Sequence, residues 1–199
     1  MKRRDILLKS FPALIATGSL PGILNNDDPT DDELMAEAEL LRELDTDAFG
    51  WMWSILRGIT DEELDWKIHP EANSTRWIIG HLNWFEEWAS DAIKETGLYL
   101  IDEQPTNTFQ ADSLEEMKER FTQAREKYDK LTAELKASDI RRPAQYLYND
   151  NDKKRAQVDL RTIIAIHSTH FYGHLYQIRM IRGTYSRAND TYKAKFDKW

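Results

Sequence analysis

The chain has 199 residues and contains no cysteine. This absence excludes disulfide bonds, thiolate metal sites and a cysteine nucleophile. Any metal ion must therefore be held by histidine, aspartate, glutamate or water. Histidine is also scarce, and three of the five histidines fall within eight residues; the five are His69, His81, His167, His170 and His174.

Several motifs that define enzyme classes are missing as well. The sequence has no Gly-rich phosphate loop, no Gly-x-Ser-x-Gly elbow, no His-Glu-x-x-His and no Glu-x-x-His pair of the kind that di-iron bundles use. The net charge of −8 argues against a nucleic-acid partner held through its phosphates. No apolar run is long and unbroken enough to span a membrane as a helix.

Residues 1–24 differ in charge from the rest of the chain. They carry four basic side chains and one acidic one, whereas the whole chain is acidic. The segment RRDILLK, in which Arg3 and Arg4 precede an apolar run, resembles a twin-arginine export signal. We therefore expect a leader at 1–24, a polar linker at 25–30 and an exported, periplasmic protein. If the leader does not act, the protein is cytoplasmic.

Four amphipathic segments follow, each with apolar residues at helical spacing. Two of them open with capping boxes, formed by Thr30 with Glu33 and by Ser113 with Glu116. Aromatic residues for a core are plentiful, since the chain has 7 Trp, 8 Tyr and 7 Phe. The helices are expected at about residues 31–57, 74–95, 113–136 and 159–183.

The order of these segments predicts an all-α fold, an antiparallel four-helix bundle over residues 31–183. Gly183 predicts the end of the last helix, and residues 184–199 are expected to form a polar C-terminal tail. No segment has a convincing strand pattern. Residues 138–158 predict an exposed turn region with a hairpin-like excursion.

His170 and His174 lie four residues apart on the apolar face of the last helix. One turn separates them, about 6 Å of rise, so both imidazoles project from the same face. His81 lies in the apolar stripe of the second helix, beside Trp77 and Trp84, so we expect it to be buried. A single histidine on such a face is usually a core residue bonded to a backbone carbonyl. Three of them, two at chelating spacing, favour a shared metal ion.

Two polar residues lie next to these predicted ligands. Gln177 follows His174 by three residues, where it can bond a bound water or ligand. His167 precedes His170 by three residues, about 60° off the line of the pair, and is expected at the edge of the site as a supporting residue. Nothing in the sequence specifies a general acid or base. The acidic residues of the second helix fit solvated surface residues as well as catalytic ones; they are Glu86, Glu87 and Asp91.

The two histidine segments together resemble the DinB-like family of four-helix bundle proteins. NSTRWIIGHLNW places His81 after a short apolar motif, and HSTHFYGHLYQIRMIRG places a His-x-x-x-His pair before Gln-Ile and an Arg-Gly helix end. The match covers residues 31–183. It implies that His81, His170 and His174 are the metal ligands and that Gln177 is the family's trailing glutamine. Many members have a glycine where this chain has Tyr176, so the pocket next to the metal is expected to be bulkier than usual.

The resemblance implies a divalent ion, zinc or nickel most often, and frequently a homodimer. Activities attached to such proteins include metal-assisted transfer of small thiols and a thiol-dependent isomerisation. The implied function is a metal-dependent transferase or hydrolase that uses an ion-activated water or thiol on a small molecule. The alternative is a non-catalytic module in which the ion joins the second helix to the fourth. An open coordination position favours the enzyme, and a fourth protein ligand favours the structural module.

The unperturbed pKa of imidazole leads to one further expectation. Histidines must lose their protons to bind a metal, and their ordinary pKa is about 6.5. The sequence therefore predicts that metal affinity weakens below about pH 6.

Overall fold

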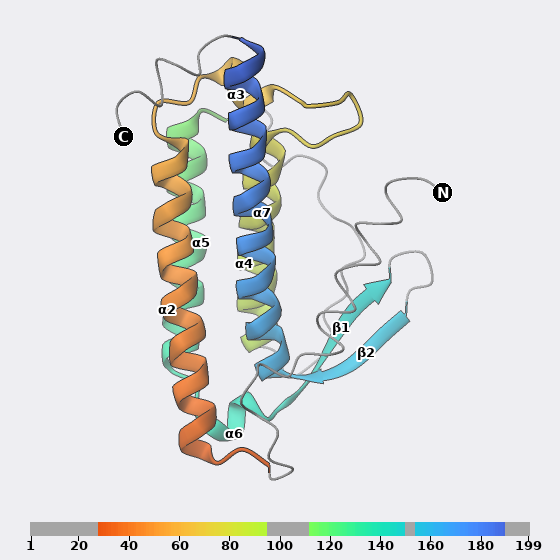
Figure 1. Cartoon of the computed structure of the whole chain (residues 1–199). Coiled ribbons are helices and arrows are strands. Elements are labelled where there is room, and N and C mark those ends of the chain that lie inside the picture. The colour runs from red at the N-terminus through yellow and green to blue at the C-terminus, as the bar shows by residue number, and fades with distance from the viewer. Residues whose placement is uncertain (1–27, 95–111, 150–153, 190–199) are drawn as a thin grey trace.

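Four long helices form a bundle in the computed structural model, which describes residues 28–94, 112–149 and 154–189 (Figure 1). The predicted leader at 1–24 lies outside the described residues, as do residues 190–199 of the predicted tail. The all-α fold class is confirmed. The long helices are α2 (Asp31–Leu56), α4 (Thr75–Lys94), α5 (Leu114–Ala133) and α7 (Leu160–Ala188); the short helices α3 (Asp61–Asp65) and α6 (Ala137–Ile140) lie in the connections.

The helices begin where the sequence provides caps. The Thr30 hydroxyl accepts the backbone N–H of Glu33 at 3.3 Å, and the Glu33 carboxylate accepts that of Thr30 at 2.8 Å. Ser113 and Glu116 form the same reciprocal pair at the start of α5. The Asp159 carboxylate accepts the N–H of Thr162 at 2.8 Å and caps α7. Each cap satisfies backbone donors that the first turn leaves unpaired, which fixes the start of the helix.

The last helix does not end at Gly183, and this prediction was wrong. Helix α7 continues to Ala188. Glycine inside a helix costs only about 1 kcal/mol relative to alanine, so packing beyond it can outweigh the cost. Tyr185 supplies that packing, because it is buried and its ring meets Trp66 edge-on with centroids 5.6 Å apart.

A strand pair occupies part of the segment that was expected to be a turn region. Strand β1 (Pro143–Asn149) pairs antiparallel with β2 (Lys154–Asp159), and the hairpin projects away from the bundle (Figure 1). The predicted hairpin-like excursion is thus confirmed, whereas the expectation that the chain has no strand is corrected. The base of the hairpin is closed by the N–H of Leu160, which donates to the carbonyl of Arg142 at 2.9 Å.

Neighbouring helices run in both relative directions. Helices α2 and α7 run up in Figure 1, whereas α4 and α5 run down. The neighbours α4 and α7 are therefore antiparallel, while α4 and α5 are parallel and need a crossover along the length of the bundle. Ion pairs hold the parallel neighbours together: Glu86–Arg125 and Asp91–Lys127 join α4 to α5, and Glu37–Arg161 joins α2 to α7.

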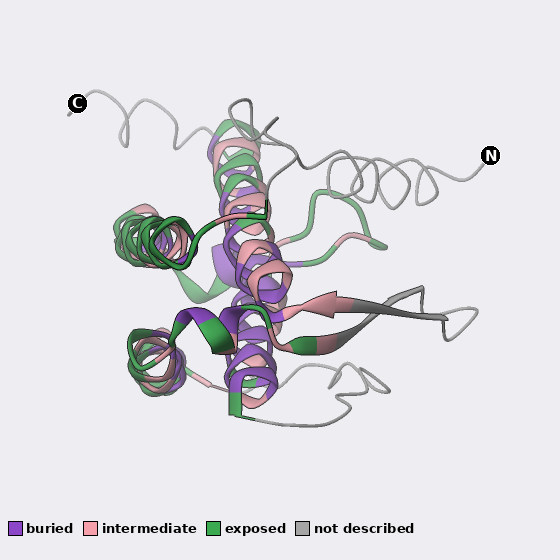
Figure 2. Ribbon diagram, turned by 90° about the horizontal axis from the view of Figure 1, so that it is seen from below, coloured by how far each residue is buried: buried purple, intermediate pink, exposed green. Residues whose placement is uncertain are grey.

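The core consists of two apolar clusters, one above the other along the bundle. The upper cluster includes Met52, Ile79, Phe121 and Leu175, and the lower one includes Trp88, Tyr128, Ile163 and Ile164. Seen along the bundle, the buried residues lie on the sides of the helices that face one another (Figure 2). None of the helices in the described segments combines the length and apolar character that crossing a membrane requires.

Candidate metal centre

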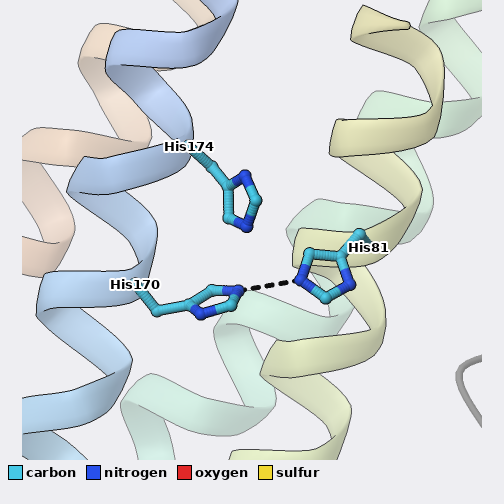
Figure 3. Close-up of side chains that lie close together, drawn as sticks. All are labelled: His81, His170 and His174. Carbon is cyan, nitrogen blue, oxygen red and sulfur yellow. Dashed lines mark hydrogen bonds between the residues drawn. The ribbon is translucent and has the colours of Figure 1, made fainter. Parts of the chain in front are cut away.

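Three histidines from two helices meet in the structure. His81 on α4 and His170 and His174 on α7 each offer a ring nitrogen, and these three atoms lie within 4.8 Å of one another. Nε2 of His81 and Nε2 of His170 are 2.9 Å apart (Figure 3). We call these three residues the histidine cluster. The fold thus brings together the residues that the sequence predicted as metal ligands.

The histidine cluster lies at the outer seam between α4 and α7 rather than on the axis of the bundle. Core-facing neighbours such as Leu82 and Phe171 are each 1 % exposed, whereas the three histidines are only half-buried. Figure 3 shows the rings between α4 and α7 with the other two helices behind them. His81, which the sequence predicted to be buried, is thus partly rather than completely enclosed. The three rings are therefore less enclosed than the core side chains beside them.

Neighbouring side chains orient the three rings. Nδ1 of His174 donates to Oε1 of Gln177 at 2.8 Å, because an amide oxygen can only accept. This bond leaves Nε2 of His174 as the nitrogen with a free lone pair, and such outer partners are a regular feature of metal-binding histidines. The His81 ring stacks on Trp77 and Trp84, with centroid separations of 5.0 and 5.8 Å. Gln177 therefore bonds a predicted metal ligand.

Burial keeps these imidazoles neutral. It lowers the pKa of His81 to about 3, with a further contribution from the charge of His174. Burial also lowers the pKa of His174 to about 4 and holds that of His170 well below its ordinary value. Neutral imidazole is the form that binds a metal ion, so the rings are ready to ligate at neutral pH.

The donor set fits a small divalent cation. Nitrogens at about 2.0 to 2.1 Å from a tetrahedral ion are about 3.3 Å apart. The 2.9 Å between the two Nε2 atoms is close to that separation, and the third nitrogen needs only a small ring movement. Within residues 28–94, 112–149 and 154–189, no fourth histidine or carboxylate joins the group. Three imidazoles with one free position are typical of catalytic zinc sites.

His167 is not part of this cluster. Its Nδ1 lies 3.0 Å from Asp45 Oδ2 and its Nε2 lies 3.1 Å from Glu86 Oε2, so both ring nitrogens already face carboxylates. His167 therefore lies in the core rather than directly beside the histidine cluster, and its supporting role stays a prediction. His69 is exposed, and its Nδ1 accepts the N–H of Glu71 at 3.2 Å.

Asp45, Glu86, Arg125 and His167 form a charged layer between the two apolar clusters. Each comes from a different long helix, and none is more than 3 % exposed. Burial alone would lower the pKa of His167, but the charges of Glu86 and Asp45 and their hydrogen bonds raise it to about 9. The layer therefore holds two anions and two cations, because Arg125 contacts Glu86 at 3.3 Å and His167 is protonated. Paired charges of this kind are the form in which ions can be buried.

The charged layer was missed in the sequence, where Glu86 fitted a surface acid equally well. The positions of these charges in the sequence could have indicated that they are buried. Asp45 follows Leu41 by four residues on the apolar stripe of α2, and Arg125 follows Phe121 by four residues on the apolar stripe of α5. A charge at a core position needs a partner, but the sequence alone does not show which helix supplies it.

Comparison with known proteins agrees with this geometry. The sequence model of the DinB superfamily matches residues 39–178, which include all three members of the histidine cluster and all four of the charged layer. Comparison with curated protein sequences finds no significant match. Proteins of this superfamily are metal-binding helical bundles, and both the fold and the histidine cluster agree with that description. The chain belongs to the DinB superfamily.

Proposed function

We propose that His81, His170 and His174 bind one divalent cation, zinc or nickel, and that the free coordination position takes a water or thiol for a transferase or hydrolase reaction. The observation that carries this proposal is the cluster of three neutral imidazoles at a half-buried seam, with no fourth ligand among the described residues. A bound divalent ion lowers the pKa of a water in such a site to about 7, which supplies a nucleophile at neutral pH.

The chain's own residues have separable roles in this proposal. Gln177 fixes the tautomer of His174, and Trp77 and Trp84 hold the ring of His81 by stacking. Phe85 packs flat on His170, with ring centroids 4.1 Å apart. These contacts hold the rings while one nitrogen of each lies within 4.8 Å of the other two.

A thiol titration tests whether a coordination position is free. The Co²⁺-loaded protein, titrated with 2-mercaptoethanol, is expected to develop a sulfur-to-cobalt charge-transfer absorption that saturates at one thiol per ion. The control is the same titration of the metal-free protein, which should give no such band. Bound Co²⁺ whose spectrum is unchanged by the thiol would instead favour the non-catalytic module, in which the position is closed.

The pH dependence of metal binding follows from the pKa values of the ligands. Because burial lowers the pKa of His81 to about 3 and that of His174 to about 4, metal affinity should be nearly constant from about pH 7 to about pH 5 and should fall near about pH 4. The ordinary imidazole pKa of about 6.5, used with the sequence alone, placed this fall below about pH 6 instead. Binding is measured by competition with a chelator at each pH.

The fold must be followed in the same samples. The pKa of these histidines is lower in the folded chain than in the unfolded one, so the unfolded state binds more protons below about pH 6.5 and stability falls as the pH falls. Circular dichroism at each pH separates unfolding from loss of affinity. A midpoint near pH 6.5 in a fully folded sample would contradict the prediction.

A further inference from the structure

The two helices that carry the histidine cluster are joined a second time in the core. On α4, Glu86 lies five residues after His81; on α7, His167 lies three residues before His170. Because α4 and α7 are antiparallel, both steps lead in the same direction along the seam. At 1.5 Å per residue, the Glu86–His167 ion pair lies about 5 to 8 Å from the histidine cluster along the helix axes.

Phe85 connects the two sites physically. Its ring is stacked on His170 at a centroid separation of 4.1 Å and an interplanar angle of 11°. It is also stacked on His167, at 5.7 Å and 20°. A change in the position of His167 therefore reaches a predicted metal ligand through a single aromatic ring in a closely packed interior.

The other two long helices anchor the ion pair from the far side. Asp45 of α2 faces Nδ1 of His167 and also accepts the hydroxyl of Ser168 at 2.6 Å. Arg125 of α5 contacts Glu86, and Tyr128 of the same helix stacks on the His167 ring at a centroid separation of 4.0 Å. His167 is thus held by contacts from all three neighbouring long helices.

We infer that His167 is a positioning residue for the metal centre: its ion pair to Glu86 sets the register of α4 against α7 so that His81 meets His170 and His174, and its ion pair to Asp45 holds α7 against α2. This inference rests on the proposed metal site. Outer contacts of this kind typically change metal affinity about 10- to 100-fold when they are lost.

The test compares His167→Gln with the wild type in the full chain, using Co²⁺ alone as the probe. The variant is expected to bind Co²⁺ about 10- to 100-fold more weakly, with a changed absorption spectrum of the bound ion because the ligand geometry is altered. Glu63→Gln is the matched control. Glu63 is fully buried and pairs with Arg182 of α7 at 2.7 Å, eight residues beyond His174, so its loss also weakens a buried ion pair.

The control should lower thermal stability but leave Co²⁺ affinity within about twofold of the wild type, because distant sites act independently. If His167→Gln does not fold, the charge-balanced pair His167→Gln/Glu86→Gln replaces it and is also expected to bind at least about tenfold more weakly. Wild-type affinity in a folded His167 variant, or equal weakening in the Glu63 control, overturns the inference. A wild type that binds no Co²⁺ refutes the proposed function instead.

Discussion

A double variant, His170→Ala/His174→Ala, is expected to lose stoichiometric metal binding. Elemental analysis of the purified wild-type protein should give close to one divalent ion per chain, and that of the variant close to none. Two of the three imidazoles that lie within 4.8 Å of one another are removed, and a single remaining histidine cannot chelate. We expect affinity to fall at least about a thousandfold, since the ligands supply most of the binding free energy at such sites.

The matched control for this experiment is His69→Ala. His69 is exposed, and its ring contacts only its own loop, through the N–H of Glu71, among the interactions that the structure describes. Its removal takes away one histidine of the chain without touching the histidine cluster, so metal content should stay at the wild-type level. Equal metal content in the wild type and the double variant would show that the ion is held elsewhere.

The second large effect is expected on stability, for Asp45→Ala. This change leaves the His167 imidazolium facing only one carboxylate and removes the shorter of the two hydrogen bonds of the Ser168 hydroxyl, which keeps only the carbonyl of Leu41 as an acceptor. Breaking a buried ion pair by deleting one partner costs about 3 to 5 kcal/mol in the free energy of unfolding. For a domain of this size, that corresponds to a fall of about 10 °C in the melting temperature. Thermal and urea denaturation measure both quantities.

Asp47→Ala controls for helix propensity and net charge. Asp47 is exposed, two residues further along α2, and its loss should change stability by no more than about 0.5 kcal/mol. A loss below about 1 kcal/mol for Asp45→Ala would contradict the ionic description of the charged layer.

The pH dependence of the free energy of unfolding is a second test of the charged layer. The pKa of His167 is about 9 in the folded chain and about 6.5 in the unfolded chain, so the folded state binds the extra proton between these values. The contribution of the protonated His167 to the free energy of unfolding is complete below about pH 6.5 and is lost as the pH rises through about 9. Wild-type stability should therefore decline above neutral pH, and the decline should be smaller in Asp45→Ala.

The sequence was sufficient where the signal is local. The caps at Thr30, Ser113 and Asp159 mark helix starts because each satisfies backbone donors within three residues. The four-residue spacing of His170 and His174 fixes their common face for the same reason. The third histidine, His81, was joined to the pair by weaker evidence, its place in the apolar stripe of another helix, and the family resemblance supported the same assignment.

Features that depend on distant packing could not be predicted. Glycine is typical of helix ends, so Gly183 predicted one there. Helix α7 continues because Tyr185 packs against Trp66. Glu86 resembles any surface acid until α7 brings His167 against it. The pH at which the ligands gain protons depends on how far the folded chain lowers their pKa, and the sequence does not give that magnitude.

The separation of the two helices in the sequence has a thermodynamic consequence. His81 and His170 are 89 residues apart, and an ion that bridges them closes a loop of that length. Covalent closure of a loop of about 100 residues restricts the unfolded chain by about 4.7 kcal/mol, and a metal bridge acts on the same entropy while it stays bound. In a chain without cysteine, a chelator that removed such an ion would release this long-range link, as a reducing agent releases a disulfide bond in other proteins.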